Sequence, residues 1–348
     1  MILKQIYFKN FRSFKKDSFS FNPFLTLVIS ENTRGKTNLI EGVYFLIMGT
    51  GFREEKEEEL IHFANQDCLV EGVFQSKDSH FKYGIILVKK NNQTSKKFYL
   101  NNVEKTFTQY KNEQIKAVLF NPEQINIIIG QPTNRRDYLN KVISAFDLDY
   151  KKHLVNFENA LKKRNKILEK TYQVEKLEEE LFFWNKYLEK EGNYLTNKRK
   201  SYLDFLNRYQ EVDAKTFKVE YLKNEFTQQR LKESLSLERK IRRTLIGPQK
   251  DDFQLFLKEK DSWRNIHRFG SRSEQRLALV WLKLGELKFY EDNFQIKPLL
   301  LLDDIFSELD KKNQQLIFSL IKKYQTVATS TEINLVDLAE IPKSLIVL

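Results

Sequence analysis

Residues 30–37, SENTRGKT, contain the residue types of a phosphate-binding loop and follow directly on an apolar segment. In such a loop, backbone N–H groups and the dipole of the next helix attract phosphate oxygens. We expect Lys36 to reach the β and γ phosphates of a nucleoside triphosphate, Thr37 to offer its hydroxyl to Mg²⁺, and Gly35 to permit close backbone approach. Ser30 stands where such loops usually carry glycine, but its side chain is small. The loop is therefore imperfect but usable.

A second stretch, Leu299–Asp304, ends a run of four leucines with two adjacent carboxylates. A fully apolar run is typical of a central parallel strand, and the carboxyl end of such a strand borders the ligand crevice. We expect Asp303 to hold Mg²⁺ opposite Thr37, and Asp304 to polarise the water that attacks the γ phosphate. The alternative is that the two acids only cap the next helix, which would leave the leucine run and the loop unrelated.

The third stretch, Phe269–Arg276, reads FGSRSEQR and precedes apolar residues at helical spacing. By itself it is explained as the start of a helix. Ser271 or Ser273 would cap the first turn, with Glu274 or Gln275 inside it. Locally this explanation is sufficient, so the stretch acquires a chemical role only in combination with the other two.

The elements around these stretches change from strand to helix and back. Residues 25–29 read as a buried strand, and residues 38–47 place Leu39, Ile40, Val43 and Ile47 on one helical face. Residues 69–120 form short β-like runs with Asn-Asn pairs as turn candidates. Residues 131–240 contain almost no breakers, and leucines recur at helical spacing, which predicts a helical lobe. After residue 247 the pattern returns to strand and helix.

The charge of the chain favours a polyanionic partner. Among 348 residues, 59 are Lys or Arg and 47 are Asp or Glu, which gives a net charge of +12. Nucleic acid would fit this surplus, although a lysine-rich proteome explains it equally well. Residues 141–246 carry 24 basic and 17 acidic side chains, a net +7, so more than half of the surplus lies in the predicted lobe. Ordinary solvated helix faces are the alternative explanation.

Other features of the composition indicate the compartment. The single cysteine, Cys68, excludes a disulfide framework within the chain, and the four histidines lack the spacing of a structural zinc site. The N-terminus lacks the apolar core of a secretory signal, and no apolar run approaches membrane-spanning length. We therefore expect a protein of the reducing cytoplasm with no membrane association.

In this order, and separated by a helical insertion, the three stretches resemble the ATPase heads of the ABC class, and in detail the RecF family of bacterial recombination mediators. The resemblance covers nearly the whole chain. Besides the loop, it is carried by Asn10–Arg12, Phe120–Gln124, Gly130, Pro132, Arg135, Arg136, Leu181–Arg199, Gly247–Asp252, Ser271–Arg276 and Asp303–Asp310. It implies an α/β, ABC-type P-loop ATPase head with a mixed β-sheet, formed by residues 1–130 and 241–348. A helical lobe would be inserted at residues 131–240.

The resemblance also implies which residues form the site. Lys36, Asp303 and Asp304 would be catalytic, and Thr37 and Asp303 would bind Mg²⁺. The signature Ser271–Gln275 would contact the γ phosphate of ATP held by a second subunit, and a D-loop with Ser307 and Asp310 would cross the same interface. The residues expected to bind ATP are Ser30, Glu31, Asn32, Thr33, Arg34, Gly35, Lys36, Thr37, Asn38, Gln124, Ser271, Arg272, Ser273, Glu274 and Gln275.

Several positions depart from the family's pattern. Ser30 and Ser273 replace glycines, Gln249 and Lys250 stand where histidine and arginine are common, and residues 329–331 contain no switch histidine. A side chain at Ser273 would slow hydrolysis or weaken closure of the dimer, unless its hydroxyl itself donates to the phosphate.

The leading hypothesis is an ATP-dependent DNA-binding ATPase. ATP and Mg²⁺ would drive homodimerisation, the closed dimer would clamp duplex or gapped DNA without sequence specificity, and slow hydrolysis would release it. The resemblance implies recombinational repair at single-strand gaps, with loading of recombinase together with RecR and RecO. The alternative is a DNA-binding scaffold that binds ATP with little or no hydrolysis. Candidate DNA contacts in the lobe are Lys162, Lys163, Arg164, Lys198, Arg199, Lys200, Arg242 and Arg243.

Overall fold

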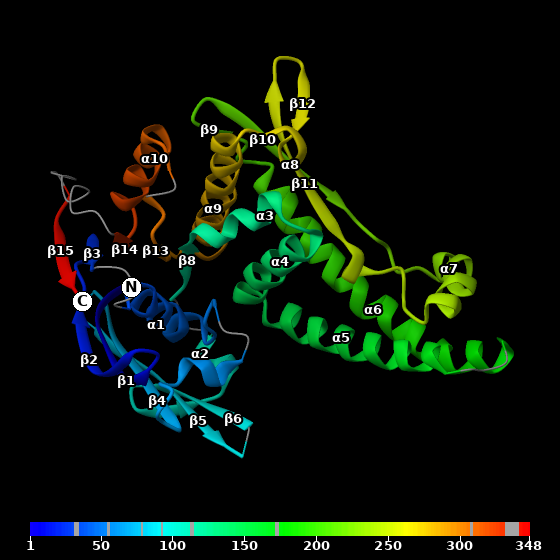
Figure 1. Cartoon of the computed structure of the whole chain (residues 1–348), viewed down its shortest axis with the longest axis horizontal. Coiled ribbons are helices and arrows are strands. Elements are labelled where there is room, and N and C mark those ends of the chain that lie inside the picture. The colour runs from blue at the N-terminus through cyan, green and yellow to red at the C-terminus, as the bar shows by residue number, and fades with distance from the viewer. Residues whose placement is uncertain are drawn as a thin grey trace. The chain divides into compact units, whose positions relative to one another are not determined.

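The computed structural model divides the chain into two compact units, which Figure 1 shows in one view. Unit 1 consists of Met1–Gln124 and Leu287–Leu348, and unit 2 of Ile125–Glu286. The structure describes residues 1–30, 35–53, 56–77, 79–91, 93–111, 115–170, 174–306, 309–330 and 341–348.

The described part of unit 1 contains two β-sheets, three whole α-helices and the end of a fourth. The helices are α1 (Lys36–Met48), α2 (Phe107–Lys111) and α10 (Lys311–Ile321), with short 3-10 turns at Glu57–Leu60 and Pro122–Ile125. The strands are β1 (Ile2–Phe11), β2 (Phe14–Ser20), β3 (Leu25–Ile29), β4 (Asp67–Ser76), β5 (Ser79–Lys90), β6 (Gln93–Leu100), β7 (Val103–Lys105), β8 (Ala117–Phe120), β13 (Leu299–Leu302), β14 (Thr326–Ser330) and β15 (Lys343–Val347).

The antiparallel sheet of unit 1 has the strand order β2-β1-β4-β5-β6-β7. It contains the β-like runs predicted between residues 69 and 100. Asn91, Asn101 and Asn102 all have positive φ, of 47°, 50° and 64°, as expected for residues of tight hairpin turns. The predicted turns at these asparagines are therefore confirmed for the residues that the structure describes.

The parallel sheet of unit 1 has the order β15-β3-β14-β13-β8 and positions the candidate site. β13 pairs in parallel with β14 on one side and β8 on the other, so Leu301 lies opposite Val327 and Leu119. All four leucines of β13 are buried. The predicted parallel strand with neighbours on both sides is confirmed, and its carboxyl end shares an edge with those of β3 and β14.

Helix α1 packs against strands of both sheets and forms the centre of unit 1. Leu39, Ile40 and Val43 are fully buried on it. Phe45, also on α1, stacks on Phe11 with ring centroids 5.8 Å apart, and Phe11 stacks on Phe8 at 5.3 Å. This aromatic packing ties the helix to the N-terminal hairpin.

Unit 2 combines long helices with a smaller antiparallel sheet of order β12-β11-β10-β9 (Figure 1). Its helices are α3 (Asn126–Ile129), α4 (Pro132–Phe146), α5 (Leu148–Glu169), α6 (Val174–Leu206), α7 (Gln228–Ile241), α8 (Ile266–Phe269) and α9 (Arg272–Phe294), whose last residues belong to unit 1, with a 3-10 turn at Pro248–Lys250. Its strands are β9 (Glu211–Val212), β10 (Lys215–Leu222), β11 (Asp252–Glu259) and β12 (Ser262–Asn265).

The lobe predicted at residues 131–240 is helical through α4 to α7, but it also contains β9 and β10. The unit boundaries lie at 124/125 and 286/287, whereas the sequence placed the lobe between 131 and 240. In unit 2, α5 and α6 run side by side over most of their lengths (Figure 1). Of the helices in the described residues, none combines the length and apolarity needed to cross a membrane.

Lys116, directly before β8, provides a test of buried charge in unit 1. It is 9% exposed, its Nζ donates to Lys111 O at 2.9 Å, and burial lowers its pKa to about 8. The charged form therefore costs stability below pH 8, and stability should recover as pH rises from about 8 to about 10.5. We expect Lys116→Met to raise the free energy of unfolding at pH 7 by about 1–3 kcal/mol. Urea unfolding at pH 7 and pH 10.5 measures this gain.

The exposed Lys15→Met variant is the control for that experiment, because it removes the same charge without relieving burial. Most of the gain of Lys116→Met over wild type should disappear at pH 10.5, where the lysine is neutral in the folded state and about half protonated in the unfolded state. A gain of equal size at both pH values would contradict the electrostatic explanation.

Candidate functional site

The three parallel strands β3, β14 and β13 end at one edge of their sheet, and the predicted loop and carboxylates follow them there. This edge forms an open pocket of about 210 Å³. It is lined by Gly35, Lys36, Thr37, Asn38, Arg53, Asp303, Asp304 and Thr329. The structure therefore brings together the lysine, the hydroxyl and the carboxylate pair, although Thr37 and Asp303 are 266 residues apart in the chain.

Gly35, directly before α1, has a backbone conformation that favours glycine. Gly35 has φ of 98°, in the left-handed region, and a Cβ there would lie 2.9 Å from Ser13 Oγ. Only glycine fits this position without strain. Lys36, which is 8% exposed, donates from Nζ to Ser30 O at 2.7 Å. The ammonium is thus held against its own loop, at the wall of the pocket.

Asp303 lies directly after β13 and is 5% exposed. Its Oδ1 accepts hydrogen bonds from Thr37 Oγ1 at 3.1 Å and from Thr329 Oγ1 at 2.9 Å. Burial raises the pKa of Asp303 above its ordinary value, and the hydroxyls of Thr329 and Thr37 and the charge of Arg53 offset this only in part. A cation at this carboxylate would relieve the cost of its buried charge, and carboxylate and hydroxyl oxygens are ligands that suit Mg²⁺.

Asp304 is fixed by the same threonine. Its backbone N donates to Thr329 Oγ1 at 2.8 Å, and its φ of 50° lies in the left-handed region. The Thr329 hydroxyl therefore accepts from the backbone of Asp304 and donates to the side chain of Asp303. One side chain at the end of β14 sets the positions of both acids.

Arg53 is a pocket residue that the sequence motifs did not predict. Its Nη2 donates to Asn38 Oδ1 and to Glu41 Oε2, both at 2.7 Å, and Arg12 Nε donates to Glu41 Oε2 at 2.8 Å. Burial alone would raise the pKa of Glu41, but the hydrogen bonds and charges of Arg53 and Arg12 outweigh it and lower that pKa. Glu41 is fully buried on α1, on the side away from the predicted apolar face, and a buried carboxylate requires a cation to approach it.

Other predicted ATP-binding residues of unit 1 do not line this pocket in the described residues. Gln124 N donates to Asn121 Oδ1 at 3.1 Å, and Asn121 N donates to Gln124 Oε1 at 3.2 Å, so this side chain closes the turn after β8. Ser30 contributes its carbonyl to Lys36. Glu31, Asn32, Thr33 and Arg34 of the loop, and Ser307 of the D-loop, lie outside the described residues.

The signature residues lie in unit 2 and open helix α9. Ser271 N donates to Glu274 Oε2 at 2.9 Å and Glu274 N donates to Ser271 Oγ at 3.3 Å, which is a capping box. Although burial alone would raise the pKa of Glu274, hydrogen bonds from Arg264 and Ser271 lower it to about 2. Ser271, Arg272 and Ser273 are exposed, whereas Glu274 is engaged by Arg264 and Lys215 and Gln275 donates to Ile266 O at 3.4 Å.

Two of the proposed DNA contacts are wrong. Arg164 is fully buried and donates to Glu238 Oε2 at 2.7 Å, and Arg199, 2% exposed, donates to Asp251 Oδ2 at 2.7 Å. These arginines hold the interior of unit 2 together, because a buried charge must be paired. Of the remaining six, Lys198 and Lys200 form ion pairs at the surface. The other four candidate DNA contacts, Lys162, Lys163, Arg242 and Arg243, are exposed.

Comparison with known protein families matches residues 2–340 to the RecF/RecN/SMC N terminal domain. The chain is 31% identical over 349 residues to the DNA replication and repair protein RecF of Caldanaerobacter subterraneus subsp. tengcongensis, which covers 95% of this chain and 94% of that protein. It is 30% identical over 361 residues to the RecF protein of Natranaerobius thermophilus, covering 96% and 92%.

Solved structures of RecF and of a related Smc head are also similar to this chain. The recombination mediator protein RecF with ATP, from the RecFOR pathway, superimposes with a TM-score of 0.83 at 28% identity, over 99% of this chain and 95% of that one. An Smc head bound to a domain of ScpA has a TM-score of 0.54 at 14% identity, over 96% and 90% of the two chains, which shows a shared fold. The predicted fold class, an α/β ATPase head of the ABC type, is confirmed. The chain belongs to the RecF family within the RecF/RecN/SMC group.

Proposed function

We propose that this chain is an ATP-dependent DNA-binding ATPase that dimerises on ATP and acts in recombinational repair at single-strand gaps. The observation that carries the proposal is the convergence of Lys36, Thr37, Asp303 and Asp304 on one pocket at the carboxyl edge of the parallel sheet. Two RecF relatives were solved with ATP or a thio analogue of ATP, which supports the same ligand for this chain.

The residues of the pocket fit a triphosphate and its cation. Lys36 would donate to the β and γ phosphates, since Ser30 O takes only one of its three N–H donors, while backbone N–H groups at the start of α1 donate to phosphate oxygens. Thr37 and Asp303 would hold Mg²⁺, whose charge neutralises the phosphate oxygens when it is bound. Asp304, at the pocket wall, would accept a proton from the attacking water.

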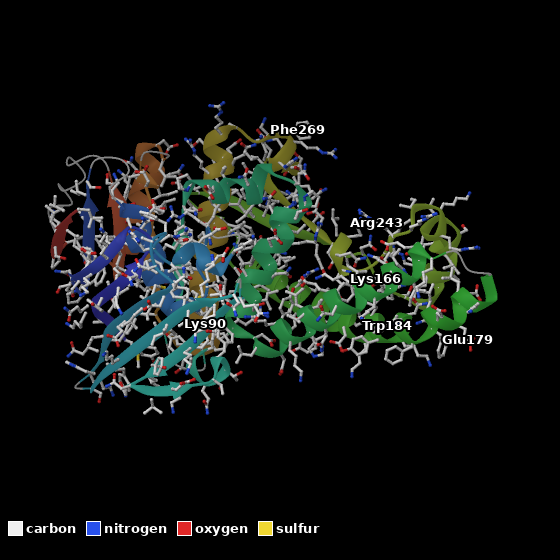
Figure 2. The ribbon with its side chains drawn as sticks, turned by 60° about the horizontal axis from the view of Figure 1, so that its bottom comes forward. Lys90, Lys166, Glu179, Trp184, Arg243 and Phe269 are labelled. Atoms are coloured by element: carbon white, nitrogen blue, oxygen red, sulfur yellow. The ribbon has the colours of Figure 1, made fainter. Side chains whose placement is uncertain are left out.

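We assign the signature residues to a second copy of the chain. Ser271, Arg272 and Ser273 are exposed, and Phe269 beside them is 66% exposed (Figure 2). An exposed aromatic side chain next to small hydroxyl residues and an arginine suits an interface that closes on a phosphate. The D-loop residue Asp310 would lie at the same interface.

The DNA would be bound by its phosphates, without sequence specificity. The net charge of +12 and the exposed cations Lys162, Lys163, Arg242 and Arg243 of unit 2 support this assignment. The RecF relatives are described as DNA replication and repair proteins, and one as part of the RecFOR pathway. By that similarity, we propose RecR and RecO as partners in recombinase loading in the cytoplasm.

A DNA-binding scaffold with little or no hydrolysis is the second candidate. It is favoured by Ser273, an exposed side chain where the family has glycine in the signature. Release of phosphate from ATP, measured with and without DNA, separates the two functions. Turnover that Lys36→Ala abolishes supports the ATPase, whereas ATP binding without turnover in the wild type supports the scaffold.

Nucleotide-linked dimerisation is the direct test of the proposed mechanism. With ATP and Mg²⁺ the wild-type chain should elute as a dimer in size-exclusion chromatography with light scattering, and with ADP or no nucleotide as a monomer. Lys36→Ala should weaken nucleotide binding by about 10–100-fold, because charge-assisted hydrogen bonds to the phosphates are lost, and should abolish the dimer. The exposed Lys16→Ala variant is the charge-matched control. A wild-type chain that binds ATP and stays monomeric would contradict an ATP site shared between two copies of the chain.

A further inference from the structure

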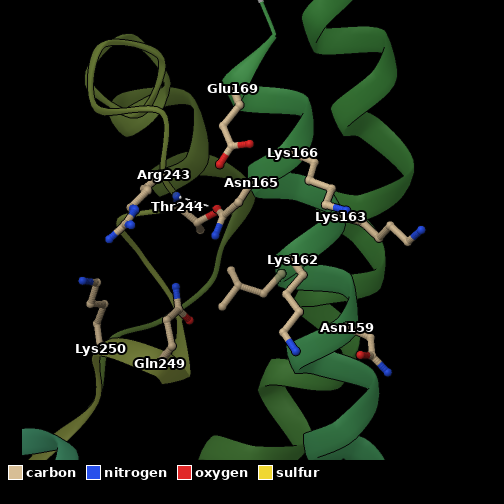
Figure 3. Close-up of a pocket in the computed structure, with 11 residues that line it drawn as sticks. Asn159, Lys162, Lys163, Asn165, Lys166, Glu169, Arg243, Thr244, Gln249 and Lys250 are labelled. Carbon is tan, nitrogen blue, oxygen red and sulfur yellow. Dashed lines mark hydrogen bonds between the residues drawn. The ribbon is translucent and has the colours of Figure 1, made fainter.

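A second pocket lies entirely within unit 2, between α5 and the segment that runs from the end of α7 to the 3-10 turn at Pro248–Lys250 (Figure 3). Its volume is about 770 Å³, and it shares no residue with the pocket of unit 1. It is lined by Asn159, Leu161, Lys162, Lys163, Asn165, Lys166, Glu169, Arg243, Thr244, Gln249 and Lys250. We call it the lobe pocket.

The charge of the lobe pocket is unbalanced. Five of its side chains are cationic and one, Glu169, is anionic. Arg243 and Lys250 lie on one wall and Lys162 on the α5 wall across from them, while Lys163 and Lys166 extend from α5 away from the wall of Arg243 and Lys250 (Figure 3). Within the described ranges, the side chains of these five cations form no ion pair, whereas Lys198 and Lys200 on the neighbouring helix each have an acidic partner.

The walls that carry these cations are held by buried polar contacts. Arg164 Nη1 donates to Thr244 Oγ1 at 2.7 Å, and Thr244 donates from its backbone N and its hydroxyl to Asn165 Oδ1 at 2.9 and 2.7 Å. Leu245 N donates to Glu238 Oε1 at 2.8 Å. The loop after α7 is thereby fixed against α5 by the buried Arg164–Glu238 pair. Unpaired cations on such a fixed frame repel one another until an anion enters, which favours binding without reorganisation.

The floor of the pocket adds hydrogen-bonding groups to this charge. Gln249 donates from Nε2 to Ile246 O at 2.7 Å, and its buried Oε1 has no hydrogen-bond partner among the described residues. A buried acceptor without a donor costs free energy, which an N–H group of a ligand would recover once the Gln249 side chain turns toward the pocket. An anion that also carries N–H donors, such as a nucleotide with its base, therefore fits the site better than a bare phosphate.

The size of the lobe pocket limits its ligand. Its volume falls within the range of about 300–1,000 Å³ that is usual for sites of small ligands. A nucleotide unit fits that range, whereas a double helix is far larger than such a pocket. We propose that the lobe pocket is a second phosphate site, which takes one nucleotide unit, either of a single strand of DNA or of a free nucleoside polyphosphate. For a DNA strand the proposal rests on the proposed function, and for a free nucleotide it stands independently.

The test compares two double variants in a Lys36→Ala background, which weakens the site of unit 1. Arg243→Ala/Lys250→Ala removes two cations from the pocket, and Lys232→Ala/Lys240→Ala removes two exposed cations of α7 outside it. All four residues are exposed, so the folds should persist, which thermal unfolding checks. The probes are a fluorescein-labelled oligothymidylate, its duplex with oligoadenylate, and a fluorescent GTP analogue, each followed by anisotropy.

We expect the pocket variant to weaken binding of the oligothymidylate or the GTP analogue on the order of tenfold, and the control variant by less than about threefold. Loss confined to the oligothymidylate identifies a DNA strand as the ligand, and loss confined to the GTP analogue identifies a free nucleotide. Equal effects of both variants on these two probes, or a loss confined to the duplex, would overturn the proposal.

The same variants with Lys36 intact separate this proposal from the proposed function. ATP-linked dimerisation should remain unchanged in both, because no pocket residue lies in the phosphate loop or the signature. A wild-type chain that fails to dimerise on ATP contradicts the proposed function alone. A wild type that dimerises, together with equal binding losses in the two variants, contradicts the lobe pocket alone.

Discussion

Asp304→Asn is expected to lower the rate of ATP hydrolysis by about 10²–10⁴-fold while ATP binding and dimerisation persist. The amide cannot accept the proton of the attacking water, and the rest of the pocket is unchanged. Asparagine is the informative substitution because Asp304 has φ of 50°, a conformation that asparagine adopts readily and alanine does not. Phosphate release and light scattering of the same samples measure the two properties.

Asp303→Asn is the matched comparison, since it removes the neighbouring charge by the same chemical change. We expect it to weaken Mg²⁺-dependent nucleotide binding itself, because Asp303 is the buried carboxylate in contact with Thr37. Its hydrogen bonds from Thr37 and Thr329 both reach Oδ1, which asparagine retains. Unimpaired hydrolysis in Asp304→Asn would show that another group accepts the proton.

Arg164→Leu is expected to destabilise the chain by about 3–5 kcal/mol. The side chain is fully buried, and its removal leaves the carboxylate of Glu238 without its cation in the interior of unit 2. Thr244 and Asn185 also lose the donors that Arg164 supplies. The midpoint and slope of urea unfolding, followed by circular dichroism, measure the loss.

Two further variants test whether the unpaired carboxylate of Glu238 causes the expected loss of stability in Arg164→Leu. Lys163→Leu changes the exposed neighbour of Arg164 and should alter stability by no more than about 0.5 kcal/mol. Adding Glu238→Gln to Arg164→Leu should restore part of the loss, because the amide oxygen still accepts from Leu245 N without carrying a charge. A double variant no more stable than Arg164→Leu would assign the loss to packing.

The core of the candidate site was predictable because its signals are local. A small-residue loop between a strand and a helix, and acids after an apolar run, are each readable within a short segment of the chain. Because parallel strands share their carboxyl edge, these local signals are sufficient to predict that Lys36, Asp303 and Asp304 line one pocket, as they do. That these residues bind and hydrolyse ATP stays a prediction until the variants are measured.

Arg53 could not be predicted in this way, because no motif surrounds it and its place depends on the buried charge of Glu41. The prediction that Arg164 and Arg199 contact DNA was wrong for a related reason. A basic residue in a charged helix is usually solvated, and the sequence does not reveal that Glu238 and Asp251 pair with these two in the interior. Whether a basic side chain is buried depends on an acidic partner far away in the sequence. The spacing of apolar residues does not reveal that partner.

The strands β9 and β10 were missed in the predicted lobe because their turn lacks glycine and proline. Asp213 and Ala214 themselves adopt positive φ, of 52° and 58°, between the paired residues Val212 and Lys215. Alanine rarely takes this conformation, so composition gives no warning of the turn. The alternation of Phe217, Val219 and Tyr221 was the signal present, and the charged residues between them hid it among helical stripes.

The hydrogen bond from Lys36 to Ser30 O anchors the ammonium of this lysine to the backbone of its own chain. An ammonium has three N–H donors, so this carbonyl occupies one of them and leaves two for a phosphate. The carbonyl belongs to Ser30, the residue directly after β3. A shift of that strand end would therefore move the ammonium and change its reach to a phosphate, without any change in the phosphate itself.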